Sequence, residues 1–90
     1  MKTAPIDIVN KLGMHARAAS KLVNLTKTFA SRIELTNPAG ETADAKRIMA
    51  VMMLEAVCGT TLELTCDGDD EEEAFAAICS LVADRFGERE

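Results

Sequence analysis

Alternation of hydrophobic and polar residues predicts the strands of this chain, because successive side chains of a strand point to opposite faces of a sheet. Thr61–Cys66 alternates most regularly, and Ile33 and Leu35 lie between polar neighbours. The segment Asn37–Gly40 contains Pro and Gly and favours a turn, so we expect a hairpin with a short return strand. The strands that we expect are Ile6–Val9, Arg32–Thr36, Glu41–Ala43 and Thr61–Cys66.

Apolar residues recur every three or four positions in three other segments, which predicts helices with one buried side. Gly59 is a suitable C-terminal cap for the second helix. Asp69, with Glu72 three residues later, resembles a capping box at the start of the third. We expect helices at Ala16–Ala30, at Ile48–Val57 and after Asp69. The third helix should bury Ala74, Phe75, Ile78, Leu81 and Val82.

The order of these elements, βαββαβα, predicts an α+β fold. We expect an open-faced sandwich in which three helices cover one face of a four-stranded antiparallel sheet. The chain has 90 residues and a hydrophobic content of 48%, which suffices for one core and leaves no room for a second domain. We therefore expect residues 1–90 to form a single domain.

The cysteine content argues against a disulfide framework and against a zinc site. The three cysteines, Cys58, Cys66 and Cys79, are odd in number and are never spaced as a CxxC pair. We expect them to be reduced thiols in the core. The N-terminal residues do not resemble a signal peptide, and no apolar stretch approaches the length of a membrane span. A cytoplasmic protein without membrane contact is the expectation.

The net charge of −5 is unevenly distributed along the chain. The stretch from Ile8 to Ile33 contains five basic residues and no acid, whereas residues 67–90 contain nine carboxylates. Such a molecule can attract anions at one region while repelling nucleic acid overall. We interpret the acidic end as solvated surface. The basic residues, which surround the only histidine, are Lys11, Arg17, Lys21, Lys27 and Arg32.

His15 lies at the predicted start of the first helix, two residues after Gly13. The first turn of a helix has unpaired N–H groups and about half a positive charge, which favour bound anions. Arg17 adds a planar set of charged donors, and an imidazole can bond covalently to phosphorus. A single histidine can equally be an ordinary surface, core or capping residue, and these residues alone leave both interpretations open. Metal binding is disfavoured, because no cysteine is close in sequence.

The run from Asn10 to Arg17, NKLGMHAR, resembles the active-site motif of HPr, the histidine-containing phosphocarrier family of the bacterial phosphotransferase system. Ile48–Leu54 resembles the second helix of that family, Gly59–Cys66 its last strand, and Asp67–Ala74 the entry to its final helix. The resemblance thus covers essentially the whole chain. The motif and the Glu-rich third helix also resemble the nitrogen-regulatory branch, NPr.

The resemblance implies a chemistry for the site. Nδ1 of His15 would accept a phosphoryl group from a phosphohistidine of Enzyme I and yield it to an Enzyme IIA. Arg17 would stabilise the phosphoryl group, together with backbone amides near Ala16 and Ala18, because charge stabilisation dominates phosphoryl transfer. No metal and no bound cofactor would be needed. The alternative is an NPr-like regulatory protein that docks on partners and signals through its phosphorylation state.

The resemblance also implies that the second helix is the docking surface of a monomeric carrier. Flexible methionine side chains suit a surface that meets several partners. Val51 and Leu54 are the expected core residues of this helix. We expect partner contacts at Ile48, Met49, Met52 and Ser20.

Two positions depart from the family pattern. Ala18 stands where the family normally has a proline after the arginine, and alanine leaves the start of the first helix less rigid. Arg47 stands where many members have a serine that a dedicated kinase phosphorylates. We therefore expect this chain to be insensitive to HPr kinase.

Overall fold

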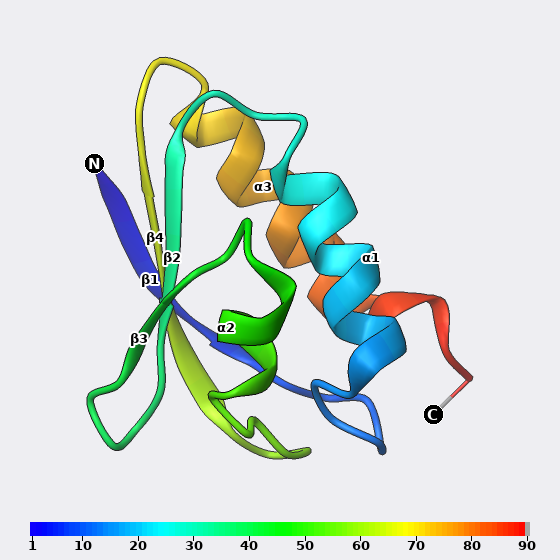
Figure 1. Ribbon diagram of the computed structural model, residues 1–90. Helices are drawn as coiled ribbons and strands as arrows, with labels where there is room; N and C mark the ends of the chain where they lie inside the picture. The colour runs from blue at the N-terminus through cyan, green and yellow to red at the C-terminus, as the bar shows by residue number, and fades with distance from the viewer. Residues whose placement is uncertain (90) are drawn as a thin grey trace.

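The computed structural model describes residues 1–89, which form a four-stranded antiparallel sheet with the helices packed on one face (Figure 1). The strands are β1 (Lys2–Asp7), β2 (Arg32–Thr36), β3 (Thr42–Asp44) and β4 (Thr61–Asp67). The helices are α1 (Ala16–Thr26), α2 (Ile48–Met52), α3 (Glu71–Ala83) and a short 3-10 helix, η1 (Arg85–Gly87). The α+β class and the order βαββαβα are confirmed.

The sheet is built around β4, with strand order β1-β4-β2-β3. β4 pairs with β1 from Cys66 opposite Lys2 to Thr61 opposite Asp7, and it pairs with β2 on its other side. Its alternating sequence explains this central position, because Leu62 and Leu64 are fully buried while the residues between them face away from the helices. The regular alternation that predicted this strand is therefore its packing pattern.

The core lies between the sheet and the helices, where α1 and α3 run side by side over the sheet (Figure 1). Burying a leucine or isoleucine side chain contributes about 1.5–3 kcal/mol, so this layer supplies most of the driving force for folding. The largest fully buried aliphatic side chains are Ile8, Leu22, Ile33, Leu35, Val51, Leu62, Leu64 and Ile78. In α3, Ala74, Ile78 and Val82 are buried as predicted, whereas Phe75 and Leu81 are only half-buried.

The first strand begins at Lys2 and ends at Asp7, so the predicted range Ile6–Val9 was wrong at both ends. Pro5 obscured the beginning of the strand, but β1 is an edge strand and a proline is tolerated there. Ile8 lies beyond the strand and is nonetheless fully buried. β3 is likewise shifted by one residue from its predicted range.

Helix α1 ends at Thr26 and not at Ala30 as predicted. The Thr26 hydroxyl lies within hydrogen-bonding distance of the carbonyl oxygens of Val23 and Ala45, at 3.1 and 2.7 Å. Because Thr26 is fully buried, these contacts tie the end of the helix to the segment after β3. A local periodicity cannot reveal such a distant partner.

Helix α2 ends at Met52, so the predicted extension to Val57 and the cap at Gly59 were wrong. Glu55 has a left-handed backbone with φ of 53°, which ends the helical path. The turn directs Leu54 and Ala56 into the core. The apolar run predicted one long covered helix, whereas the structure uses its second half as a packed loop.

The capping box predicted for Asp69 and Glu72 does not form. Asp70 is the residue before α3, and its carboxylate accepts hydrogen bonds from the N–H groups of Ala30 and Ser31, at 2.8 and 2.9 Å, and from the Ser31 hydroxyl. These bonds, led by that of the Ser31 hydroxyl, lower the pKa of Asp70. The carboxylate thus joins the start of α3 to the loop after α1 instead of capping its own helix.

The cysteines divide into two kinds. Cys66 is buried in β4, and burial raises the pKa of its thiol to about 11, while Cys79 is half-buried and its pKa is also raised by burial. Cys58 is exposed, so the prediction that all three thiols lie in the core was wrong for this residue. Within residues 1–89, no helix combines the length and the apolar character needed to cross a membrane.

We predict that Asp70→Asn lowers the free energy of unfolding at neutral pH. Below about pH 4 the stability of this variant should depend less on pH than that of the native chain. A carboxylate with a lowered folded pKa stabilises the fold above its unfolded pKa, and this contribution is lost as the pH falls through the folded pKa. Urea unfolding at several pH values measures the effect. Glu73→Gln is the control, because Glu73 is exposed on the first turn of the same helix. Equal acid sensitivity of Asp70→Asn and the native chain would contradict this account.

Candidate functional site

His15 is the residue that caps the start of α1, with an extended backbone of φ −79° and ψ 177°. The two residues before it hold it in place. Gly13 has a left-handed φ of 69°, and a Cβ atom there would lie 2.7 Å from the carbonyl oxygen of Ala56. The N–H group of Met14 donates to that same oxygen at 2.8 Å, and the Met14 side chain is buried. The site is therefore built on the loop that follows α2.

The Nδ1 atom of His15 faces the start of the helix. It accepts a hydrogen bond of 3.3 Å from the N–H group of Arg17. The N–H groups of Ala16 and Ala18 make no hydrogen bond to any other part of residues 1–89. Donors of this kind at a helix start favour an anion. Of the predicted residues, Arg17 contacts Nδ1 through its backbone N–H group, while Ala16 and Ala18 lie beside it in the first turn of α1.

The Nε2 atom of His15 faces the C-terminal segment, where it contacts a carboxylate oxygen of Glu88. The other oxygen of Glu88 accepts a hydrogen bond of 2.9 Å from the side-chain amide of Asn10, which also donates to the carbonyl of Gly13 at 2.8 Å. The Asn10 bond first, and then the bond to His15, lower the pKa of Glu88. The two nitrogens of the imidazole therefore lie in opposite electrostatic surroundings.

Glu88 and Asn10 are the site residues that the sequence did not reveal. We interpreted the acidic end of the chain as solvated surface, but the Glu88 side chain is only 12% exposed, so this interpretation was wrong for it. His15 and Glu88 are 73 residues apart, and no local pattern connects them. Asn10 lies within the NKLGMHAR run and is fully buried, a burial that marks it only once the fold is known.

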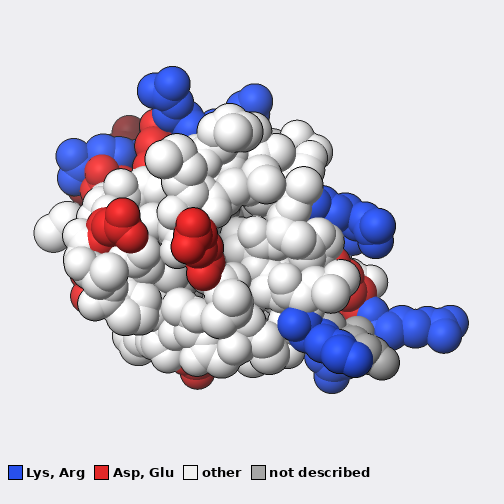
Figure 2. All heavy atoms as spheres, turned by 60° about the horizontal axis from the view of Figure 1, so that its bottom comes forward, with Lys and Arg blue, Asp and Glu red and all other residues white. Residues whose placement is uncertain are grey.

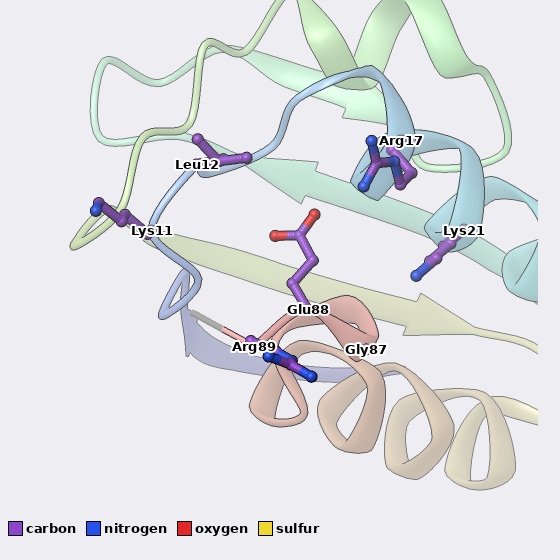
Figure 3. Close-up of a pocket in the computed structure, with 7 residues that line it drawn as sticks. All are labelled: Lys11, Leu12, Arg17, Lys21, Gly87, Glu88 and Arg89. Atoms are coloured by element: carbon purple, nitrogen blue, oxygen red, sulfur yellow. The ribbon is translucent and has the colours of Figure 1, made fainter.

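A cavity of about 380 Å³ lies beside Glu88. Figure 3 shows Glu88 rising from the C-terminal segment toward the space between Leu12 and Arg17. Four cationic side chains and one carboxylate border this space, which suits anionic groups. The lining residues are Lys11, Leu12, Arg17, Lys21, Gly87, Glu88 and Arg89.

The predicted contact residues of α2 differ in exposure. Ile48 and Met49 are 37% and 67% exposed, as predicted, and Val51 and Leu54 are buried, also as predicted. Met52 is half-buried, as is Ser20 on α1. Leu12, Met53 and Val57 also have exposed apolar side chains, and none of these three residues was predicted as a partner contact.

The end of the molecule that lies lowest in Figure 1 is brought forward in Figure 2. Much of its surface is uncharged, with acidic side chains set within it and Lys and Arg at the margins. Arg47 lies immediately before α2 and makes no capping hydrogen bond with its side chain.

Within residues 1–89, no group of three or more His, Cys, Asp or Glu side chains is arranged to hold a metal ion.

Comparison with known proteins gives one consistent family. Residues 2–84 match the family model described as the PTS HPr component phosphorylation site. The chain is 51% identical over 83 residues to the phosphocarrier protein HPr of Cupriavidus necator, covering 92% of both chains. It is 41% identical over 83 residues to the phosphocarrier protein NPr of Escherichia coli, again covering 92% of both.

Solved structures agree with this family. HPr-C-His from Thermoanaerobacter tengcongensis superposes with a TM-score of 0.94 at 39% sequence identity, covering the whole of both chains. An HPr dimer from the same organism superposes with a TM-score of 0.78 at 40% identity, covering 98% of this chain and 100% of that one.

We predict that Gly13→Ala lowers the free energy of unfolding far more than Gly40→Ala does. Both glycines have a left-handed φ, of 69° and 87°, which costs about 1 kcal/mol for alanine. Only Gly13 is also packed against backbone, which adds about 2 kcal/mol of overpacking, whereas nothing lies within 4 Å of a Cβ at Gly40. Urea unfolding of both variants measures the difference. Equal losses would show that the loop is not held by this contact.

Proposed function

This chain belongs to the HPr family of the phosphotransferase system, and on that basis we propose that it is a phosphoryl carrier. In this proposal His15 accepts a phosphoryl group from Enzyme I and passes it to an Enzyme IIA. The observation that carries the proposal is the position of His15, whose Nδ1 faces the N–H groups at the start of α1. We place the exchange in the cytoplasm and expect the carrier to act as a monomer without metal or cofactor.

Nδ1 is the proposed nucleophile. A phosphoryl group bound there would lie near the N–H groups of Ala16 and Ala18 and within reach of the exposed Arg17 side chain. Backbone donors and a guanidinium both stabilise the charge on the phosphoryl oxygens. The bond between phosphorus and Nδ1 forms as the bond to the donor's nitrogen breaks. In the onward step a nucleophile of the acceptor bonds to phosphorus as the P–Nδ1 bond breaks, and the electron pair of that bond returns to Nδ1. The backbone N–H groups and the Arg17 side chain need only position and stabilise the phosphoryl group while it is transferred.

The proposed docking surface consists of Leu12, Ile48, Met49, Met53 and Val57, all exposed and apolar. It adjoins the site, because the loop after α2 packs against Gly13 and Met14. Flexible thioethers suit one surface that meets both a donor and an acceptor. Half-buried Met52 and Ser20 lie at its edge in this proposal. Nucleic acid and membranes are not proposed partners.

The similarity to NPr supports a second candidate function. In that case the chain would serve nitrogen regulation, signalling to partners through its phosphorylation state, and not sugar transport. Both functions need phosphohistidine at His15 and the same surface. Rates of phosphate uptake from the Enzyme I of the sugar system and from that of the nitrogen system distinguish the two, because the physiological donor should react faster.

We predict that His15→Ala abolishes acid-labile phosphorylation by Enzyme I and phosphoenolpyruvate while leaving the fold intact. No other imidazole is present in the chain. Radiolabelled phosphate uptake, with circular dichroism to verify folding, measures the result. Uptake by the folded variant would refute His15 as the carrier residue.

We predict that Arg17→Ala slows transfer about 100-fold in both directions, since it removes a charged donor from the transferring group. Arg17→Lys should recover only part of the rate, because lysine lacks the planar fork. Stability should change little, since the side chain is exposed. Arg32→Ala, which removes an exposed arginine from β2, is the control. Native rates in both Arg17 variants would make Arg17 a simple surface charge.

A further inference from the structure

We infer that Glu88 is a positioning residue for the proposed phosphoryl transfer. Its carboxylate holds the imidazole of His15 in the tautomer that carries its proton on Nε2. That tautomer leaves the lone pair of Nδ1 available to phosphorus. The inference deepens the proposed function and depends on it for its consequence, but its structural basis is the set of contacts around the ring.

Both nitrogens of the ring specify the same tautomer. Nδ1 accepts a hydrogen bond from the N–H group of Arg17 and therefore carries no proton of its own. Nε2 contacts an oxygen of Glu88, and an ionised carboxylate can only accept, so Nε2 acts as a donor. A neutral imidazole has one donor and one acceptor nitrogen. At 3.3 Å the bond from Arg17 is long and therefore weak, so the close contact with Glu88 is the stronger constraint on the tautomer.

Glu88 remains ionised because its pKa is lowered, first by the hydrogen bond from Asn10. Asn10 is fully buried, and its amide group bonds both to Glu88 and to the carbonyl of Gly13, at 2.9 and 2.8 Å. The carboxylate is therefore attached to the same loop that carries His15. This attachment fixes its position relative to the ring.

The backbone before Glu88 is shaped to deliver it to the ring. Arg85, Phe86 and Gly87 are three consecutive left-handed residues, with φ of 56°, 55° and 79°. Such angles are costly for residues other than glycine and persist only where packing compensates. Phe86 is fully buried, and its carbonyl accepts a hydrogen bond of 2.6 Å from Lys21. The turn reverses the chain after α3 and directs Glu88 toward the site (Figure 3).

The fixed tautomer removes any need for a proton transfer during the reaction. When Nδ1 bonds to phosphorus, the bond to the donor's nitrogen breaks and its electron pair stays with the donor. His15 keeps its Nε2 proton and becomes a phosphorylated imidazolium, whose positive charge faces Glu88. In the onward step the electron pair of the P–N bond returns to Nδ1 and the original tautomer is restored. Glu88 stabilises the cationic ring in both directions.

The competing explanation is that Glu88 only fastens the C-terminal segment to the loop that carries His15. A fastening role predicts a loss of stability and no change in the ring. Glu88→Gln separates the two explanations, because glutamine has nearly the same shape, can bond to either form of the ring and carries no charge. Glu88→Asp keeps the charge on a shorter side chain. Glu73→Gln, on the exposed surface of α3, is the matched control.

Two measurements test the inference in the folded, full-length chain. Imidazole ¹⁵N chemical shifts report the tautomer of the neutral ring, and phosphate exchange with Enzyme I reports transfer in both directions. We expect a mixture of tautomers and transfer about tenfold slower in Glu88→Gln. Glu88→Asp should retain the native tautomer and transfer faster than Glu88→Gln. Glu73→Gln should match the native chain in both measurements.

An unchanged tautomer in Glu88→Gln, with or without a loss of thermal stability, would overturn the inference. A changed tautomer with native transfer rates would also overturn it, because positioning would then have no consequence. If the native chain takes up no phosphate at all, the proposed function fails instead, and the ¹⁵N shifts still show whether Glu88 sets the tautomer.

Discussion

The close contact between Gly13 and the backbone of the loop after α2 is the constraint on which the site depends. A Cβ atom at this position would lie 2.7 Å from the carbonyl oxygen of Ala56. The same oxygen accepts a hydrogen bond from the N–H group of Met14. The contact fixes where the chain leaves β1 and where α1 begins. The direction of His15 and of the N–H groups that follow it is set by that starting point. An extended loop at this place would present the same residues without a common orientation.

The two ring nitrogens of His15 acquire different roles because they meet different parts of the chain. The start of α1 offers donors to Nδ1, while the C-terminal segment offers an acceptor to Nε2. The acidic and basic segments of the sequence meet at this site. Glu88, from the acidic C-terminal segment, lies in the basic region, where its carboxylate accepts a hydrogen bond from Asn10. Three cations of that region, Lys11, Arg17 and Lys21, border the cavity, where anions can approach.

Helix α2 shows how packing replaces intrinsic stability. Five residues are too few for an isolated helix, because ordering the backbone of the first turn loses more conformational entropy than its hydrogen bonds offset. Fully buried Val51 holds this one against the core, and its other side remains exposed with Met49. The left-handed turn at Glu55 then brings Ala56 to the loop that carries His15. One short segment therefore both supports the site and supplies the apolar surface beside it.

The sequence by itself determined the strands at Arg32–Thr36 and Thr61–Asp67 closely, because each has one buried face and alternation records that face directly. It also determined the order of elements and the motif around His15, whose residues are neighbours in the chain. Only the tertiary structure decided where α1 and α2 end, since those ends depend on a distant carbonyl and on a left-handed turn. Asp70 likewise bonds to another loop and not to its own helix. Glu88 lies 73 residues from His15, and a contact between such distant residues leaves no periodicity in the sequence that could predict it.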